Sequence, residues 1–371
     1  MARIALVAGI CTSRDAISNA VRMQEQLLVD GGHEVVVFSQ HTDFPGPTHR
    51  ATPHVWSLQS DEWFRSADLV VFHFGIHYSL FDELLLSHPN AARVVHFHNV
   101  TPPEFLGGKS RIQAIRGLDQ FSIASRADAF WSDSSHNTAC LAEWSDVDPA
   151  AVSLLPLAVH WEILTCDQDR LAMHERPKRV IAVGRLTDAK GQRDIVDAVA
   201  RLPETLQRRV VVDLIGAEAH SDPTYIEALR EQIKDFGLER IVRIELDLDD
   251  ATLRDRYAAA DVFVSASRHE GFCVPVIEAL AGRCRVIATD VGAVSETLGT
   301  CGTLLPVGDV PALAVAIDQA LLAGPLSEEE FKVVLRHLDQ FSVESLRVRL
   351  LALVDAVLLA GPGIDPGPCS Q

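Results

Sequence analysis

The sequence is short of positive charge. Its 371 residues include 33 lysines and arginines against 51 aspartates and glutamates, which gives a formal net charge of −18. Proteins that bind nucleic acids draw much of their affinity from basic side chains that displace counterions from phosphates. The acidic excess therefore excludes DNA or RNA as the main partner. A local basic site remains compatible with it, because net charge governs solubility and association rather than chemistry.

The sequence also lacks a hydrophobic run of membrane-spanning length. Its most apolar run, residues 350–360, contains Asp355, and a spanning helix needs about 20 apolar residues. The short apolar stretch at residues 1–10 is followed by polar residues without a cleavage pattern, which favours a first β-strand over a signal peptide. The N-terminal charges make no strong basic face, so we expect a cytoplasmic protein with at most peripheral membrane contact.

Paired cysteines are missing as well. The seven cysteines are scattered along the chain without a Cys-x-x-Cys pair. This distribution is typical of reduced thiols in a cytoplasmic protein and offers no zinc site. Hydrophobic residues make up 47% and charged residues 23% of the sequence, which excludes a largely disordered chain.

Short β-branched runs alternate with helix-patterned stretches in two successive series. The first series is 3–8, 35–39, 68–74, 93–97 and 129–132, and the second is 180–183, 210–215, 241–246, 262–265 and 286–289. Such alternation predicts parallel sheets built from βαβ units, hence an α/β fold with two doubly wound domains and a cleft between them. The length of the chain also favours two domains.

The predicted domain boundaries follow from composition. We expect an N-terminal domain at 1–165, a C-terminal domain at 166–340 and a helix at 341–360 that could pack back on the N-terminal domain. Residues 361–371 are rich in glycine and proline and are predicted to be a flexible tail.

Residues 184–191 form a predicted strand-to-helix loop. Gly184 and Gly191 stand at its ends, and Arg185 and Lys190 lie between them. Glycines allow a tight turn, a helix N-terminus offers N–H groups to an anion, and two cations complement a diphosphate. The spacing matches neither a dinucleotide-binding nor a Walker A motif, so two exposed cations without a ligand remain an equal alternative.

A second motif places Glu270 and Glu278 on either side of a glycine-containing loop and the start of an apolar helix. Pro275 suits the first helical turn, and Glu278 lies near that turn, where its charge complements the helix dipole. Glu270 follows a strand at the sheet edge where α/β proteins bind ligands. Taken singly, Glu270 is better explained as a solvated loop residue and Glu278 as a charge at a helix start; together, and with Arg185 and Lys190, they indicate a site.

These motifs resemble those of the retaining nucleotide-sugar glycosyltransferases of family four, which have the GT-B architecture of two Rossmann-like domains facing across a cleft. The resemblance covers nearly the whole chain and is densest at residues 179–309. Residues 283–285 and Leu157-Ala158 depart from the family pattern, without removing a charged group of the donor site. Further matching positions are 32–35, 154–156, 184–185, 190–191, 257–262, 270–280, Gly292 and Glu296.

The resemblance implies a donor site made by Gly184, Arg185, Lys190, Glu270, Gly271, Phe272, Cys273 and Glu278. Arg185 and Lys190 would hold the donor diphosphate, Glu278 would accept hydrogen bonds from the ribose, and Glu270 with the backbone amides of 271–273 would grip the sugar. Fixed cations stabilise the charge that develops on a leaving diphosphate. We therefore expect no metal and no cofactor, the nucleotide sugar being a substrate.

The N-terminal half contributes His98, which follows a strand within His96-Phe-His98-Asn99. In the family a histidine near this position contacts the donor sugar; the alternative is a structural loop histidine. His96 and His98 share a strand face, yet no third metal ligand is evident, and His73 is interpreted as a core residue. We expect the acceptor side to be formed by two loops. Gly9, Ile10 and Ser13 belong to the loop of residues 9–13, and Asn99 belongs to the loop after the strand at residues 93–97.

The predicted activity is that of a retaining hexosyltransferase. It would move a sugar from a nucleotide diphosphate sugar to the hydroxyl of a sugar, lipid-linked sugar or small-metabolite acceptor. UDP sugars are preferred to GDP sugars as the donor because they are more frequent in the family. An inactive nucleotide-sugar-binding module and a GT-B epimerase or phosphorylase are the alternatives. Asp247 and Asp249 have the spacing of a metal motif, but they lie among other acids and are interpreted as surface residues.

Overall fold

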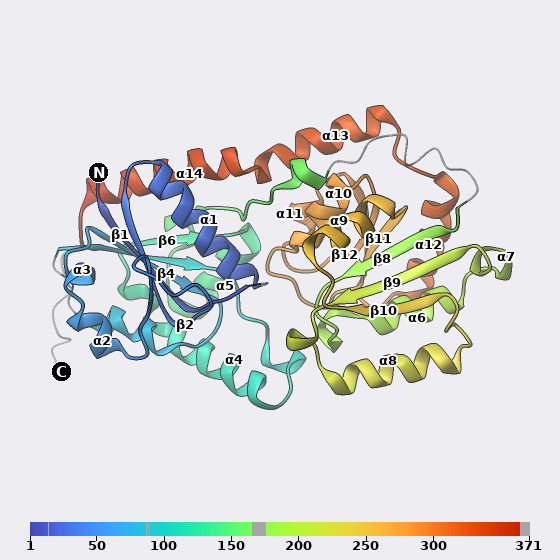
Figure 1. Ribbon diagram of the computed structural model, residues 1–371, viewed down its shortest axis with the longest axis horizontal. Helices are drawn as coiled ribbons and strands as arrows, with labels where there is room; N and C mark the ends of the chain where they lie inside the picture. Colours follow the sequence, from blue (N-terminus) through green and yellow to red (C-terminus); the bar gives the residue numbers. More distant parts are fainter. Residues whose placement is uncertain (14, 87, 89, 165–175, 364–371) are drawn as a thin grey trace. The chain divides into compact units, whose positions relative to one another are not determined.

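The computed structural model describes the chain except residues 14, 87, 89, 165–175 and 364–371. It contains two compact units (Figure 1). Unit 1 comprises residues 1–158 together with the chain from Val343 onward, and unit 2 comprises Val159–Ser342. The domain boundary predicted at 165/166 and most of the predicted tail lie outside the described residues. The division between the units falls earlier, after Ala158.

Unit 1 is built on a seven-stranded parallel sheet with the order β3-β2-β1-β4-β5-β6-β7. Its strands are β1 (Arg3–Cys11), β2 (Glu34–Thr42), β3 (His49–Ala51), β4 (Leu69–Phe74), β5 (Ala92–Phe97), β6 (Ala129–Ser132) and β7 (Val152–Leu154). All five predicted strands are present. The prediction missed β3 and β7, which have three residues each and carry too little pattern to be recognised.

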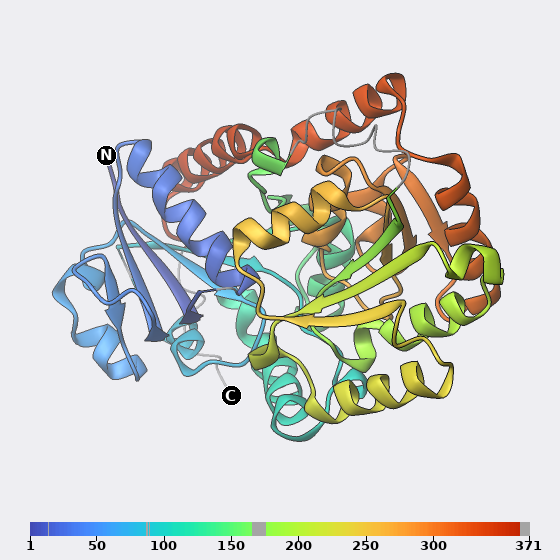
Figure 2. The ribbon, with the colours of Figure 1, turned by 45° about the vertical axis from the view of Figure 1, so that its right-hand side comes forward.

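Helices cover both faces of this sheet, which is why every residue of β4 and β5 is buried. On one face, β1 packs against α1 (Ala16–Asp30) and α14 (Val343–Ala360), which lie side by side in Figures 1 and 2. On the other face lie α4 (Gly108–Phe121) and α5 (Ser135–Ser145). Among the described residues, no helix combines the length and apolarity that crossing a membrane requires. Two short helices, α2 (Val55–Ser60) and α3 (Glu62–Arg65), complete the unit.

Unit 2 repeats this plan with a six-stranded parallel sheet of order β10-β9-β8-β11-β12-β13. Its strands are β8 (Lys178–Val183), β9 (Val210–Gly216), β10 (Val242–Leu246), β11 (Val262–Ser265), β12 (Arg285–Thr289) and β13 (Gly302–Leu305). Its helices are α6 (Gln192–Ala200), α7 (Glu204–Gln207), α8 (Pro223–Asp235), α9 (Asp250–Ala259), α10 (Val274–Ala281), α11 (Val294–Leu298), α12 (Val310–Ala323) and α13 (Glu328–Leu338). Both sheets have the doubly wound order, so the predicted fold class is confirmed.

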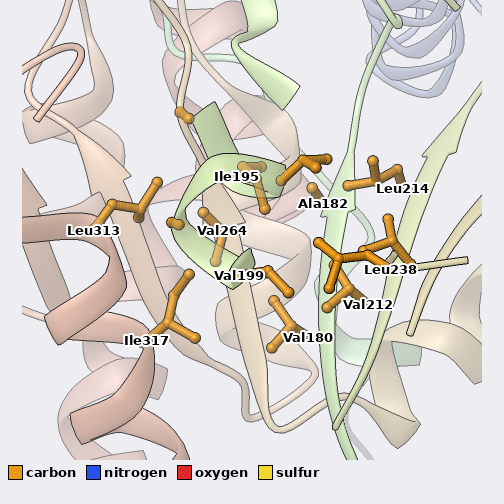
Figure 3. Close-up of a cluster of buried hydrophobic side chains, with 14 of the residues drawn as sticks. Val180, Ala182, Ile195, Val199, Val212, Leu214, Leu238, Val264, Leu313 and Ile317 are labelled. Carbon is orange, nitrogen blue, oxygen red and sulfur yellow. The ribbon is translucent and has the colours of Figure 1, made fainter. Parts of the chain in front are cut away.

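The core of unit 2 fixes the strands whose ends carry the predicted donor site. Val180 of β8 and Val264 of β11 pack beneath α6 and α12, from which Ile195, Val199 and Ile317 project (Figure 3). These side chains are at most 2% exposed. The burial holds β8 and β11 side by side, so the loops after them emerge at the same edge of the sheet.

Candidate functional site

Two loops meet at the carboxyl edge of the unit 2 sheet: residues 184–191 after β8, and residues 266–273 after β11. The backbone N–H of Arg268 donates to the carbonyl oxygen of Ala189 at 2.8 Å. The Arg268 guanidinium donates to the carbonyl of Asp188 at 3.2 Å and forms an ion pair with Asp194 of α6 at 3.1 Å. Parallel sheets bind ligands at this edge, and here the two predicted motifs form one structural site.

Glycines make the close approach of these loops possible. Gly191 has a φ of +63°, and a Cβ there would collide with the carbonyl oxygen of Ala266. Gly292, in the loop after β12, has a φ of +57°, and a Cβ there would collide with the carbonyl oxygen of Glu270. The backbone that carries Glu270 is therefore confined on both sides.

Glu270 and Lys190 form an ion pair at the centre of this site. The Lys190 Nζ donates to Oε1 of Glu270 at 2.6 Å, and the Ser267 hydroxyl donates to the same oxygen at 2.7 Å. Oε2 of Glu270 receives no hydrogen bond from any residue in the described part of the chain. One carboxylate oxygen is thus held by the protein while the other is left for a ligand.

The ionisation of Glu270 is set by its partners. Burial acts to raise its pKa, but the Lys190 ammonium and the hydrogen bonds from Lys190 and Ser267 hold the pKa below its usual value. Glu270 is only 7% exposed, yet it carries a negative charge at neutral pH. An ionised carboxylate only accepts hydrogen bonds, so its chemistry is to bind hydroxyl groups rather than to donate a proton.

Glu278 lies on α10, with Pro275 in the first turn of that helix as predicted. Glu278 is the fifth residue of α10, beyond the turn where the helix dipole acts most strongly. Its Oε2 accepts a 2.7 Å hydrogen bond from the hydroxyl of Tyr257, which is buried. Burial raises the pKa of Glu278, and the bond from Tyr257 partly offsets that rise. Tyr257 thus orients this carboxylate and favours its ionised form.

The remaining residues of the predicted donor site differ in burial and in their contacts with the rest of the protein. Arg185 is exposed, and its guanidinium makes no hydrogen bond or ion pair with another described residue. Phe272 is buried with its ring 5.7 Å from that of Phe341, so its side chain belongs to the core. Cys273 is also buried, which raises the pKa of its thiol. Gly184 lies beside Arg185 and, like Gly271, is partly exposed.

His98 lies in unit 1 with both ring nitrogens engaged by the protein. Nδ1 is 3.0 Å and 3.1 Å from the two carboxylate oxygens of Asp133, and Nε2 is 2.9 Å from Nδ1 of His73. The side chain is 2% exposed. In this arrangement neither nitrogen is open to a sugar, so the contact inferred for His98 requires one of these bonds to be exchanged.

One part of the sequence interpretation was wrong here. His96 and His98 do have a third histidine beside them, because His73 of β4 pairs in register with His96 of β5. The three side chains each offer a nitrogen within 4.8 Å of the others. The sequence could not show this, because strand register brings together residues that are far apart in the chain.

The predicted acceptor-side residues are not all available to a ligand. Gly9 and Ile10 belong to β1 rather than to a loop, which corrects the sequence interpretation; Gly9 is buried against Tyr78, and Ile10 is 41% exposed. Ser13 is exposed and binds Asp43 through its N–H at 3.0 Å. Asn99 is buried and donates to Asn137 at 2.8 Å.

Three contributors to these sites escaped the sequence interpretation. Ser267 lies three residues before Glu270, within the motif that was recognised, so its hydroxyl was a detectable signal. Asp133 directly follows the predicted strand at 129–132, which also places it at the ligand-binding edge of the sheet. Tyr257 was among the positions that match the family, but no role was inferred for it, because its bond to Glu278 joins two helices and leaves no signal in the sequence.

Comparison with known proteins finds a family model that matches most of the second unit. A family model described as "Glycosyl transferases group 1" matches residues 167–331. This segment is therefore similar to the group 1 glycosyltransferases. The match bears out the family resemblance drawn from the sequence, and the matched segment contains Lys190, Glu270 and Glu278.

Curated relatives of the chain are enzymes of sugar transfer. The MMP alpha-(1->4)-mannosyltransferase of Mycolicibacterium hassiacum is 28% identical over 47% of the chain and 41% of its own length. The mannosylfructose-phosphate synthase of Agrobacterium fabrum is 34% identical over 33% of the chain and 27% of its own length. A D-inositol 3-phosphate glycosyltransferase of Corynebacterium aurimucosum is 28% identical over 61% of the chain and 56% of its own length. The chain thus spans roughly a quarter to a half of the length of these relatives.

Solved structures with the same fold extend over both units. Sucrose-phosphate synthase from Thermosynechococcus elongatus superposes with a TM-score of 0.76 at 21% identity, covering 97% of this chain and 100% of that one. The Anabaena protein HepE in complex with UDP-glucose superposes with a TM-score of 0.73 at 16% identity, covering 96% and 100%. At these identities the likeness establishes the fold alone. The chain has the two-domain GT-B fold, as predicted.

Proposed function

We propose that the chain is a glycosyltransferase that moves a sugar from a nucleotide diphosphate sugar to an acceptor hydroxyl. The observation that carries the proposal is the Lys190–Glu270 ion pair at 2.6 Å. It lies in the segment that matches the group 1 family model, on two loops that are bonded to each other at the carboxyl edge of the sheet. Lys190 thus offers a cation to a diphosphate directly beside the carboxylate of Glu270, which can accept hydrogen bonds from sugar hydroxyls.

Each charged group has a separate task in this proposal. Lys190, assisted by Arg185, stabilises the negative charge that grows on the leaving diphosphate, which lowers the barrier because the charge is largest in the transition state. Glu270 accepts hydrogen bonds from the sugar through its unoccupied Oε2. Glu278, whose Oε2 is bound by Tyr257, accepts ribose hydroxyls through its other oxygen.

The donor we propose is a UDP-hexose. The family resemblance favours UDP over GDP, and a protein of the same fold has been solved with UDP-glucose. The acceptor we propose is a sugar, a lipid-linked sugar or a small metabolite; the D-inositol 3-phosphate glycosyltransferases among the relatives illustrate the last class. The alternatives of an inactive binding module and of an epimerase or phosphorylase become outcomes of the assays below.

The mechanism we propose is front-face transfer with retention of configuration and without a metal or cofactor. A double displacement needs a carboxylate poised behind the anomeric carbon. The carboxylate of Glu270 is held through Oε1 by Lys190 and Ser267, which suits a residue that holds a sugar in place through Oε2. The leaving phosphate then accepts the proton of the acceptor hydroxyl, so no separate base is needed.

A binding experiment tests the donor site. We expect one nucleotide sugar of a panel to raise the melting temperature of the full chain, because a ligand that binds only the folded state stabilises it by mass action. Lys190→Ala should abolish most of this shift. Lys332→Ala, which removes an exposed lysine of α13 paired with Glu329, is the matched control and should retain it. An equal shift in the Lys190→Ala variant would refute the assignment.

A further inference from the structure

Three histidines and one aspartate form a buried cluster at the carboxyl edge of the unit 1 sheet. His73 comes from β4, His96 from β5, His98 from the residue after β5 and Asp133 from the residue after β6. Asp133 accepts from Nε2 of His96 at 3.0 Å and lies equally close to Nδ1 of His98. Gln24 of α1 contacts the remaining nitrogen of His96 at 3.1 Å. The cluster is thus a continuous chain of hydrogen bonds.

The geometry favours a hydrogen-bonded chain over a metal centre. The rings of His73 and His98 lie within 5° of parallel, with centroids 5.2 Å apart and their nearest nitrogens 2.9 Å apart. This is the arrangement of two imidazoles joined edge to edge by one N–H···N bond. Two nitrogens on a tetrahedral zinc, each about 2.1 Å from it, would be about 3.4 Å apart. Both nitrogens of His96 are also occupied, by Gln24 and Asp133.

A single assignment of protons satisfies this chain. A neutral imidazole has one donor and one acceptor nitrogen. Asp133 is ionised, because its electrostatic interaction with His98 and its hydrogen bonds with His96 and His98 outweigh burial and lower its pKa. It therefore requires N–H groups at Nε2 of His96 and Nδ1 of His98. The acceptor left on His98 is Nε2, to which Nδ1–H of His73 donates, and Nε2 of His73 remains buried without a partner among the described residues.

Burial keeps His96 and His73 in the neutral form that this assignment requires. Burial lowers the pKa of His96 to about 4 and holds that of His73 well below its usual value. Both rings are therefore uncharged at neutral pH. The proton positions are fixed by the hydrogen-bond partners rather than observed, and they predict one particular tautomer of His98.

We propose that Asp133 and His73 are positioning residues for His98, and that they determine which nitrogen a ligand can use. Asp133 holds His98 in the Nδ1–H form, so Nε2 is a hydrogen-bond acceptor. His73 occupies this acceptor until a sugar hydroxyl replaces it. The inference rests on the proposed function together with the family resemblance, which implies that a histidine near this position contacts the donor sugar. Its consequence is that removing Asp133 and removing His73 affect the enzyme in opposite directions.

The tautomer is tested without any assay of activity. In the full chain labelled with ¹⁵N-histidine, NMR of the ring nitrogens at neutral pH should show His98 protonated at Nδ1 and unprotonated at Nε2. Asp133→Asn should redistribute that proton, since an amide cannot accept from both histidines as the carboxylate does. His41→Gln, which changes an exposed histidine outside the cluster, should leave the His98 signals unchanged.

Several results would overturn the positioning role. One is an Nε2–H tautomer of His98 in the unaltered protein, and another is a His98 spectrum that does not change in Asp133→Asn. A third is one equivalent of a metal ion in the purified protein that is lost in His73→Phe. The spectrum of the unaltered protein decides the first point even if Asp133→Asn does not fold. Asp133→Glu, which keeps the acceptor, should retain the Nδ1–H form.

Steady-state kinetics test the consequence for the reaction. Asp133→Asn should lower kcat by about a hundredfold, the cost of a misplaced reacting group, with partial rescue in Asp133→Glu. His73→Phe should lower the KM for the donor with kcat unchanged, because it removes the competitor for Nε2 of His98. A raised KM in His73→Phe would contradict the proposal. If no nucleotide sugar is turned over, the proposed function fails, while the NMR result still decides the tautomer.

Discussion

At the scale of the residue, the donor site is organised by shared partners. Lys190 and Ser267 both bind Oε1 of Glu270, and Tyr257 binds one oxygen of Glu278. In each case the protein occupies one carboxylate oxygen and leaves the other. The two pKa values shift in opposite directions, because the partners of Glu270 lower its pKa whereas burial raises that of Glu278.

The role of Tyr257 is open to a direct test. Its hydrogen bond lowers the pKa of Glu278, so Tyr257→Phe should raise that pKa further. Glu278 then becomes protonated at higher pH, and the acid limb of donor binding should move to higher pH in a titration of Kd against pH. Tyr225→Phe, which alters another buried tyrosine of unit 2, is the control. An unchanged pH profile would show that Tyr257 serves only to fill the core.

Sequence reasoning succeeded for residues within one motif and failed for contacts between elements. Lys190 and Glu270 were singled out in two separate motifs. They lie in contact because the loops that carry them follow the neighbouring strands β8 and β11. His73 was interpreted as a core residue, which its burial bears out, but its bond to His98 depends on the pairing of β4 with β5. No local pattern encodes that register.

At the scale of the element, the loop that carries Glu270 is confined by Gly292. Gly292→Ala should disturb this loop, because a Cβ collides with the carbonyl of Glu270. We expect a loss of about 1–3 kcal/mol of stability together with a large fall in donor affinity. Gly308→Ala is the matched control: this residue also has a positive φ, yet its Cβ would meet no atom within 4 Å. Melting curves and donor titrations of both variants should separate the two causes, because Gly308→Ala introduces only backbone strain whereas Gly292→Ala adds the collision. Equal losses of stability and of donor affinity in the two variants would contradict the confinement of the Glu270 loop.

The element boundaries show what a periodic pattern can and cannot reveal. The predicted strand at residues 3–8 extends to Cys11 in the structure, so Gly9 and Ile10 continue β1 instead of forming a loop. The polar residues from Cys11 onward resemble a loop in sequence, but β1 and β2 remain paired as far as Cys11 and Thr42. Pairing with a neighbouring strand, rather than local composition, decides where a strand ends.

At the scale of the whole molecule, the sequence predicted two doubly wound sheets because buried parallel strands are continuous apolar runs. The domain boundary was harder to predict, because composition alone does not fix it. Residues 343–360 form α14, whose Leu346, Leu350 and Val354 pack in the core of unit 1 rather than with the unit that precedes them. The sequence interpretation had considered this packing for a helix at 341–360, but a helical pattern alone does not determine the partner of a helix.

The histidine cluster makes unit 1 sensitive to acid. The pKa of His96 falls from 6.5 in the unfolded chain to about 4 in the folded one, so between these values the unfolded state binds the additional proton. The stability is complete above pH 6.5 and is lost as the pH falls toward 4, and the lowered pKa of Asp133 acts in the same direction. At 1.36 kcal/mol per pH unit the loss from His96 approaches roughly 3 kcal/mol.

Unfolding measured against pH tests this linkage. The free energy of unfolding of the full chain should fall between pH 6.5 and pH 4, and His96→Phe should reduce the slope of that fall. His54→Phe, which replaces a histidine on the surface, should not reduce it. Stability that increases toward pH 4 would contradict the assignment of neutral, buried imidazoles.

The central claim is that Glu270 and Lys190 form the donor site of a glycosyltransferase, and the most direct measurement is transfer itself. With the nucleotide sugar that stabilises the protein, the unaltered chain should release nucleoside diphosphate and form a product that retains the donor's anomeric configuration. Glu270→Ala should lower the rate by about a hundredfold, and azide should not rescue it with an inverted product. Glu329→Ala, which removes an exposed carboxylate of α13, should leave the rate unchanged. No release of nucleoside diphosphate, an inverted product, or a sugar trapped covalently on Glu270 would contradict the account.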